Sequence, residues 1–213
     1  MARAYILVFL RQFKIYFIMF EQFISFFKRK ILRDNQVRWN YKYAKGDWEG
    51  LKNPALNNRL LPAIHYIKSL KPQADILEIG CGEGVFQQML GVDNYQSFEG
   101  TDISDWAINQ AQAFANAQTV FIAADMEIYL PQKPKYDVIV ITDSVYYSAK
   151  PLQLLKRYQS YLQPDGIFII TMNAYKHSDK VWQKIEEHYR PRYQEVVANT
   201  FGKWTCKVYP LQN

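Results

Sequence analysis

The pattern of apolar and polar positions changes at about residue 45, and beyond that point two periods alternate. Short apolar runs, typical of strands covered on both faces, predict strands near residues 75–80, 96–102, 119–124, 136–142 and 166–172. Segments with helical spacing lie between them, near residues 84–91, 104–116 and 151–162. Strands that alternate with helices form a parallel sheet through right-handed crossovers. We therefore predict a doubly wound α/β fold.

Further elements are predicted on both sides of this alternating region. A helix is expected over Ala55–Leu70, in which Pro62 either kinks the helix or begins its second half. After the fifth strand, the pattern predicts a helix over Asp179–Tyr189. Two strands follow, Tyr193–Thr200 and Trp204–Tyr209, and we expect them to form a hairpin.

Residues 1–45 are strongly basic, and this changes how the overall charge is interpreted. They carry a net charge of +8, whereas the whole chain of 213 residues carries +6, so residues 46–213 carry −2. Because the larger part of the chain is mildly acidic, its charge gives no reason to expect a nucleic acid as partner.

Charged and large apolar side chains near the N-terminus fall on opposite sides of a helix. Most charged positions from Arg3 to Arg29 lie in one arc, opposite a row of phenylalanines. This pattern favours a helix in a membrane interface, with residues 1–30 meeting anionic lipid. A helix packed on the domain or across a dimer is the alternative. A membrane-spanning helix is disfavoured, since Ala4–Leu10 is the longest uncharged stretch.

The most informative segment is Asp75-Ile-Leu-Glu-Ile-Gly-Cys-Gly-Glu-Gly84, a buried strand that leads into a glycine-rich turn. Glycines there allow backbone angles that side chains forbid and let a ligand approach the main chain. A helix follows, and its free N–H groups face the same side. The third glycine, Gly84, comes one residue earlier than in the dinucleotide-binding spacing, where this chain has Val85.

Acidic residues follow the next strands at the spacing of a nucleotide site. Asp102 lies 20 residues after Gly82, the distance at which an acid contacts ribose hydroxyls in βαβ units. Asp125 ends the third predicted strand, and Thr142-Asp-Ser144 ends the fourth. Ligands of open α/β sheets bind at this carboxyl edge.

Together, these motifs resemble the class I S-adenosylmethionine-dependent methyltransferases of the small-molecule type. The resemblance covers roughly Lys45–Leu211, and the segment Leu162-Gln-Pro-Asp-Gly166 departs from the family's pattern at Asp165, where glycine is usual. It implies a mostly parallel, seven-stranded, Rossmann-like sheet with an antiparallel C-terminal strand. It also implies that residues 46–213 are the S-adenosylmethionine-binding domain, which leaves residues 1–45 as the basic amphipathic helical extension and the start of a lid.

The resemblance also implies a set of contacts to S-adenosylmethionine, whose product is S-adenosylhomocysteine. Glu78 and the turn that contains Gly80, Cys81, Gly82 and Gly84 would hold the methionine end. The other expected contacts are Asp102 with ribose, Ile103, Asp125 and Met126 with adenine, Thr142 beside the sulfonium, and Tyr43 and Trp48 in the lid.

The residues that would act on the acceptor are less clearly marked. Asp143, Tyr147 and His177 lie at the expected substrate edge and are the catalytic candidates. No segment resembles the N-P-P-Y motif of amide or base methylation. By elimination, we predict a small-molecule or glycan acceptor, methylated on a hydroxyl oxygen and, as a further hypothesis, presented at a membrane.

Two other functions remain open: a non-catalytic S-adenosylmethionine-binding module, and an NAD-dependent enzyme of similar fold. The two cysteines are 125 positions apart and the three histidines are scattered, so neither a disulfide framework nor a metal site is expected. This composition predicts a cytoplasmic protein, with peripheral contact to the inner face of a membrane as an alternative.

Overall fold

The computed structural model describes residues 35–175 and 177–211. The chain divides into two units, Met1–Arg38 and Trp39–Asn213, and the fold and the candidate site lie in the second. The predicted N-terminal amphipathic helix and its contact with a membrane lie outside the described residues. In the described ranges, no helix combines the length and the apolar character that crossing a bilayer requires.

Seven strands form one sheet in the order β3-β2-β1-β4-β5-β7-β6. The strands are β1 (Ala74–Ile79), β2 (Tyr95–Asp102), β3 (Thr119–Ala123), β4 (Tyr136–Thr142), β5 (Leu162–Asn173), β6 (Tyr193–Asn199) and β7 (Gly202–Pro210). The first five strands pair in parallel, whereas β7 is antiparallel to both β5 and β6. The structure thus confirms the predicted mixed sheet and its C-terminal hairpin.

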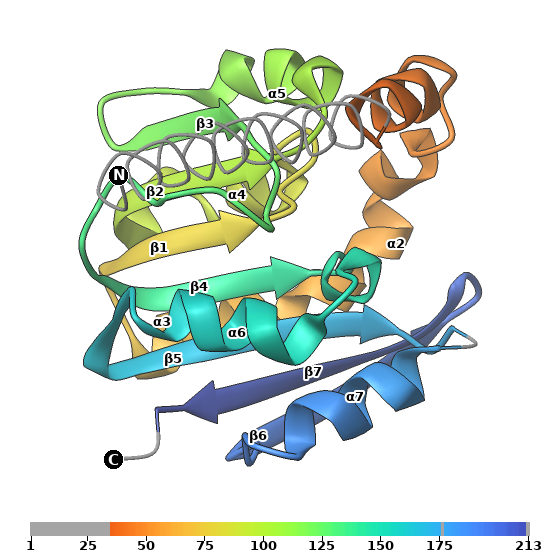
Figure 1. Cartoon of the computed structure of the whole chain (residues 1–213). Helices are drawn as coiled ribbons and strands as arrows, with labels where there is room; N and C mark the ends of the chain where they lie inside the picture. The colour runs from red at the N-terminus through yellow and green to blue at the C-terminus, as the bar shows by residue number, and fades with distance from the viewer. Residues whose placement is uncertain (1–34, 176, 212–213) are drawn as a thin grey trace, which may run out of the picture. The chain divides into compact units, whose positions relative to one another are not determined.

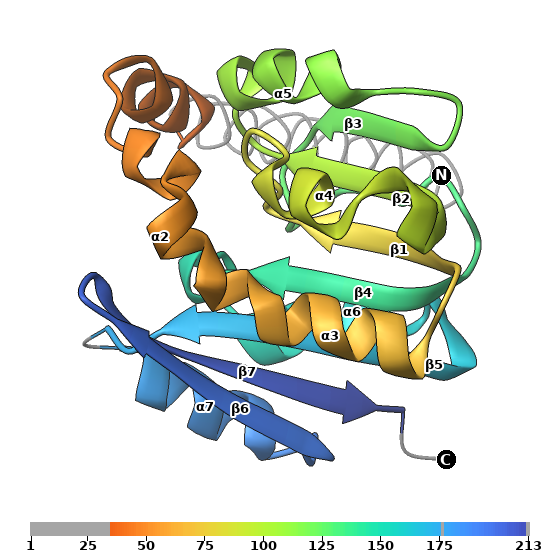
Figure 2. The ribbon, with the colours of Figure 1, turned by 180° about the vertical axis from the view of Figure 1, so that it is seen from behind.

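Helices cover both faces of this sheet, as Figures 1 and 2 show from opposite sides. Their bounds are α2 (Pro54–Asn57), α3 (Leu61–Leu70), α4 (Val85–Leu90), α5 (Asp105–Ala111), α6 (Pro151–Gln159) and α7 (Ser178–Glu186). One core cluster joins α3, α4 and α5 to the sheet, and a second joins α6 and α7 to its other face. The order of the elements confirms the predicted doubly wound arrangement.

The central strands are buried on both faces, which explains their uninterrupted apolar runs. In β1, Ile76 belongs to the first cluster and Leu77 to the second. In β4, Val138 and Ile139 divide in the same way. Because successive side chains of a strand point to opposite faces, each residue of such a run packs under a different layer of helices.

Two element boundaries differ from the prediction. The expected helix over Ala55–Leu70 is α2, a 3-10 helix at Asn58–Leu60 (η2) and α3, with Pro62 in the first turn of α3, where its missing N–H costs no hydrogen bond. The strand expected near residues 166–172 begins earlier, since β5 starts at Leu162, with a register shift between the pairs at Leu162 and Ile167. Such a shift accommodates extra residues within a strand.

Candidate functional site

The glycine-rich turn after β1 is fastened to the end of β2. The N–H groups of Gly80 and Cys81 donate to the carbonyl of Thr101 at 2.7 and 2.9 Å. Gly82 has a φ of 54°, and a Cβ added to it would lie 2.8 Å from the Tyr43 hydroxyl oxygen. The turn therefore depends on glycine both for its backbone conformation and for the close approach of Tyr43.

Asp102 ends β2 and links the turn to the following helix. Its Oδ2 accepts from Gly82 N at 3.0 Å, and its Oδ1 accepts from Ser104 N at 2.9 Å. Burial raises the pKa of Asp102 to about 6, although the N–H donors of Ser104 and Gly82 favour the ionised form. The parallel pairing of β1 and β2 thus brings Asp102 beside the glycine turn, as the sequence spacing predicts.

Glu78 is fully buried next to the same turn and keeps one carboxyl oxygen without a partner. Its Oε1 accepts from the Thr142 hydroxyl at 2.8 Å, whereas Oε2 has no hydrogen-bond partner among the described residues. Burial raises the pKa of Glu78 to about 8, against the opposing effects of Thr142 and of the Arg59 charge. A buried, unpaired carboxyl oxygen costs free energy until a donor reaches it.

Arg59, in η2, is a site residue that the sequence reasoning missed. It is only 5% exposed, and its Nη1 lies 2.9 Å from Oδ2 of Asp143. Its Nε is buried and has no hydrogen-bond partner within the described structure. In the sequence, Arg59 lies among Leu56, Leu60 and Ala63, which are buried in the structure. A charged residue within such an apolar stripe could have indicated a buried functional arginine.

Asp143 follows β4 with both carboxylate oxygens engaged. Besides the ion pair with Arg59, its Oδ1 accepts from Asn173 N at 2.8 Å. Its φ of 49° lies in the left-handed region, which aspartate tolerates better than most residues. Burial raises the pKa of Asp143, while Arg59, Asn173 and the Trp204 side chain oppose that rise. The carboxylate is therefore firmly held at the end of β4.

Three residues predicted to contact adenine lie after β2 and β3. Asp125 accepts from Glu127 N through Oδ1 at 2.8 Å, and burial raises its pKa. Met126 packs against the second core cluster, and its carbonyl accepts from the Tyr158 hydroxyl at 2.9 Å. Ile103 is half-buried directly after Asp102. Because β2 and β3 are parallel neighbours, these residues follow adjacent strand ends.

Residues 39–48 contact several parts of this carboxyl edge. The Asn40 side-chain oxygen accepts from the Ser104 hydroxyl at 2.7 Å. The Tyr43 ring stacks on that of Trp106, with centroids 6.0 Å apart. The Trp39 ring meets that of Tyr147, after β4, at 4.7 Å. The segment thus joins the ends of β2 and β4, where a lid is predicted.

The remaining predicted site residues are more scattered. Tyr147 is 47% exposed and lies in ring contact with Tyr146 at 4.6 Å. His177 is exposed at the start of α7 and is the residue that precedes its first turn. Cys81 is buried, which raises its thiol pKa. Within the described ranges, no group of His, Cys, Asp and Glu could hold a metal ion.

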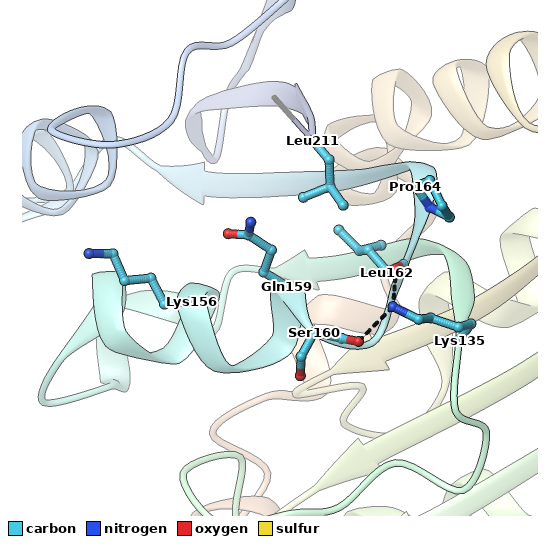
Figure 3. A pocket seen from close by; sticks show the side chains of 7 residues that line it. All are labelled: Lys135, Lys156, Gln159, Ser160, Leu162, Pro164 and Leu211. Carbon is cyan, nitrogen blue, oxygen red and sulfur yellow. Dashed lines mark hydrogen bonds between the residues drawn. The ribbon is translucent and has the colours of Figure 1, made fainter. Parts of the chain in front are cut away.

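The surface also has a hollow at the opposite edge of the sheet, shown in Figure 3. Its lining includes Lys135 before β4, Ser160 after α6 and Leu162 at the start of β5. The Lys135 ammonium donates to the carbonyls of Ser160 and Leu162, both at 2.9 Å. Lys135 therefore links the segment before β4 to the segment before β5. This hollow lies at the opposite end of the strands from the glycine turn.

Two curated proteins are similar to this chain over part of its length. Malonyl-[acyl-carrier protein] O-methyltransferase 2 from Ilyobacter polytropus is 30% identical over 109 residues, which are 50% of this chain and 42% of that protein. Human arginine-hydroxylase NDUFAF5, a mitochondrial protein, is 26% identical over 150 residues, which are 70% of this chain and 42% of that protein. The chain thus spans less than half of the length of these curated relatives.

Solved structures show the same fold. The N-methyltransferase NodS from Bradyrhizobium japonicum WM9, in complex with S-adenosyl-L-homocysteine, superposes with a TM-score of 0.62 at 16% identity, over 76% of this chain and 90% of that chain. The family model described as "Methyltransferase domain" matches residues 53–205. These matches confirm the predicted resemblance to class I methyltransferases and the predicted cofactor, S-adenosylmethionine. The chain therefore belongs to the methyltransferase domain family.

Proposed function

We propose that the protein transfers a methyl group from S-adenosylmethionine to a small-molecule acceptor. One observation carries the proposal: Glu78 and Arg59 are both buried, and each keeps one polar atom without a hydrogen-bond partner among the described residues. The amino-acid end of the cofactor bears an ammonium and a carboxylate, which these two side chains complement. The donor set therefore fits this cofactor.

Glu78 would accept from the cofactor's ammonium through Oε2 while Thr142 holds its other oxygen. A neighbouring cation favours the ionised form of Glu78, which burial otherwise disfavours. Arg59 would donate from Nε to the cofactor's carboxylate, and Asp143 would hold the other side of its guanidinium. We thus assign Asp143 to the anchoring of Arg59.

The N–H groups of Gly82 and Ser104 hold the Asp102 carboxylate beside the glycine turn. From that position Asp102 would accept hydrogen bonds from the ribose hydroxyls. Ile103 and the Met126 main chain would border adenine, and Asp125 would accept from the adenine amino group. Tyr43 would close the turn from the lid side, where its hydroxyl approaches Gly82. The cofactor supplies an activated methyl group, and these residues would orient it and exclude water.

For the acceptor, we propose a small molecule or glycan methylated on oxygen. The relative from Ilyobacter polytropus is an O-methyltransferase, which supports oxygen as the acceptor atom. NodS is an N-methyltransferase, so nitrogen is the main alternative. Tyr147 and His177 stay the candidates for proton transfer, because both carboxylate oxygens of Asp143 are engaged. Cytoplasmic location, with membrane contact through residues 1–30, remains part of the proposal.

A transfer assay tests this function. The full chain would be incubated with S-adenosylmethionine labelled in its methyl group and with panels of hydroxylated, carboxylated and amino acceptors. We expect label in an oxygen-containing acceptor, and its loss in the variant Asp102→Ala. Label found only in amines would show that the acceptor atom is nitrogen and not oxygen. Binding of S-adenosylhomocysteine without transfer to any panel would favour a binding module, and binding of NAD instead would overturn the proposal.

A further inference from the structure

The turn after β3 has an internal framework that fixes Asp125. The N–H groups of Ile128 and Tyr129 donate to the carbonyl of Asp125 at 3.0 and 2.9 Å. The N–H of Glu127 donates to the Asp125 carboxylate at 2.8 Å. The four residues after Asp125 therefore fold back on it and set the direction of its side chain.

The turn has both packed and exposed apolar side chains, since Met126 and Tyr129 pack against the second core cluster. Ile128 is 55% exposed and Leu130 is 69% exposed, although both are large apolar residues. Segments with few buried apolar contacts open more easily than the core does. Hydrogen bonds from neighbouring elements therefore add to the packing of Met126 and Tyr129 in fixing the position of the turn.

Two consecutive residues of α6 supply those hydrogen bonds. Arg157 donates from Nη1 to the carbonyl of Glu127 and from Nη2 to that of Tyr129, the latter at 2.6 Å. The hydroxyl of Tyr158 donates to the carbonyl of Met126 at 2.9 Å. Ser148, before α6, adds a hydrogen bond to the Glu127 carboxylate at 2.6 Å.

Arg157 suits this role because its guanidinium is a rigid fork. Two donors in one plane can hold two carbonyls in a fixed relative position, which the single ammonium of lysine cannot do. The guanidinium carbon also lies 5.8 Å from the centre of the Tyr158 ring, which limits where the fork can move. The fork and the Tyr158 hydroxyl together engage three carbonyls of one short turn.

We propose that Arg157, assisted by Tyr158, is a positioning residue for the adenine subsite. It acts through the carbonyls of Glu127 and Tyr129, and the turn in turn fixes the carboxylate of Asp125 and the main chain of Met126. Arg157 contacts no cofactor atom itself in this proposal. The inference rests on the proposed function, in which Asp125 accepts from the adenine amino group.

The test compares two ligands whose bases differ in the group at C6 and in N1, which accepts a hydrogen bond in adenine and carries a hydrogen in hypoxanthine. S-adenosylhomocysteine carries the amino group, and S-inosylhomocysteine carries a carbonyl oxygen in its place. Calorimetry would measure both in the full-length protein and in the variants Arg157→Ala, Arg157→Lys and Tyr158→Phe. Lys156→Ala is the matched control, since it removes a neighbouring cation of α6 that is exposed.

We expect the wild-type protein to prefer the adenine ligand, because the inosine carbonyl would face the Asp125 carboxylate. In Arg157→Ala the preference should fall at least ~10-fold, mainly through weaker binding of the adenine ligand. The ligand preference of Arg157→Lys and of Tyr158→Phe should lie between those of the wild type and of Arg157→Ala. The preference of Lys156→Ala should match that of the wild type. In transfer assays, Arg157→Ala should raise KM for the cofactor more than it lowers kcat.

A purely structural role of Arg157 would give a different result. Arg157→Ala would then lower the midpoint of thermal unfolding but leave the ratio of the two affinities unchanged, and this would overturn the inference. Arg157→Lys provides the same comparison if the alanine variant does not fold. A wild-type protein that binds both ligands equally would overturn the adenine subsite itself. A wild-type protein that binds neither would instead overturn the proposed function.

Discussion

Arg59 and Asp143 form a largely buried ion pair, with 2.9 Å between Nη1 and Oδ2, although 84 positions separate them in the chain. Arg59 lies in η2, directly before α3, and Asp143 follows β4. The pair therefore joins η2 to the carboxyl edge of the sheet. A buried pair of this kind contributes little net stability, but the loss of one partner leaves an uncompensated charge.

Removal of the cation should therefore be costly. Arg59→Met keeps much of the side-chain volume but leaves the Asp143 carboxylate without its ionic partner. We expect the free energy of unfolding to fall by about 3–5 kcal/mol, as measured by urea denaturation. The double variant Arg59→Met with Asp143→Asn, which removes both charges but keeps an acceptor for Asn173 N, should recover part of that loss. A double variant no more stable than the single one would contradict the pair's role.

Asp143→Asn separates an anchoring role from general base catalysis. The amide oxygen can still accept from Arg59 or Asn173, so we expect KM for the cofactor to rise and kcat to change little. The measurement is the pH profile of steady-state transfer. A fall in kcat of about 100-fold or more, with loss of the acidic limb of the profile, would mean that Asp143 is the base instead.

Glu78→Gln should stabilise the free protein at alkaline pH. The pKa of Glu78 is raised from its ordinary value of 4.5 to about 8 by burial. The folded state thus holds a proton that the unfolded state has lost between these values, and the wild-type free energy of unfolding falls as pH rises across that window. The variant cannot ionise, so its advantage should reach about 1–3 kcal/mol at pH 9 and vanish at pH 4.

Urea denaturation from pH 4 to 9 checks this difference. Glu195→Gln, an exposed glutamate of β6, serves as the matched control and should follow the wild type. An identical pH dependence in Glu78→Gln and the wild type would show that Glu78 titrates normally.

Binding of the cofactor should release a proton near neutral pH. Because burial raises the pKa of Glu78 to about 8, we expect it to be mostly protonated at pH 7 in the free protein, whereas the incoming ammonium favours its ionised form. Calorimetry with S-adenosylhomocysteine in two buffers of different ionisation enthalpy should therefore give different apparent enthalpies. The affinity should increase as pH rises from about 6 to 8. In Glu78→Gln the buffer dependence should disappear.

Gly82→Ala should disturb the turn in a way that Gly50→Ala does not. A Cβ at Gly82 would face the Tyr43 hydroxyl at 2.8 Å on a backbone with positive φ, whereas a Cβ at Gly50 meets nothing within 4 Å. We expect Gly82→Ala to lose about 1–2 kcal/mol of stability and most cofactor affinity. Thermal unfolding and calorimetry would check both. Similar behaviour of the two variants would mean that the turn tolerates a side chain.

Local signals in the sequence were strong where a residue's environment follows from its neighbours. The runs at Ile76–Leu77 and Val138–Ile139 marked buried parallel strands because every residue of such a strand is covered. Asp102 could be placed beside Gly82 because the length of a βαβ unit nearly fixes that distance.

Long-range relationships gave no such signal. Asp143, the partner of Arg59, lies 84 positions along the chain, so nothing near Arg59 in the sequence indicates it. The early start of β5 depends on the pairing of Leu162 with Tyr136. The sequence Gln163-Pro-Asp-Gly166 is typical of a turn, so it gave no sign of this pairing. The hydrogen bonds from Arg157 to the turn after β3 likewise involve two carbonyls about 30 positions away in the chain.

The central claim is that Glu78 and Arg59 recognise the amino-acid end of the cofactor, and one comparison tests it most directly. Calorimetry would measure S-adenosylhomocysteine beside 5′-methylthioadenosine, which has the same nucleoside but lacks the ammonium and the carboxylate. We predict that the wild-type protein binds the first at least ~100-fold more tightly, and that Glu78→Gln abolishes most of that preference. Equal affinity for the two ligands in the wild-type protein would contradict the claim.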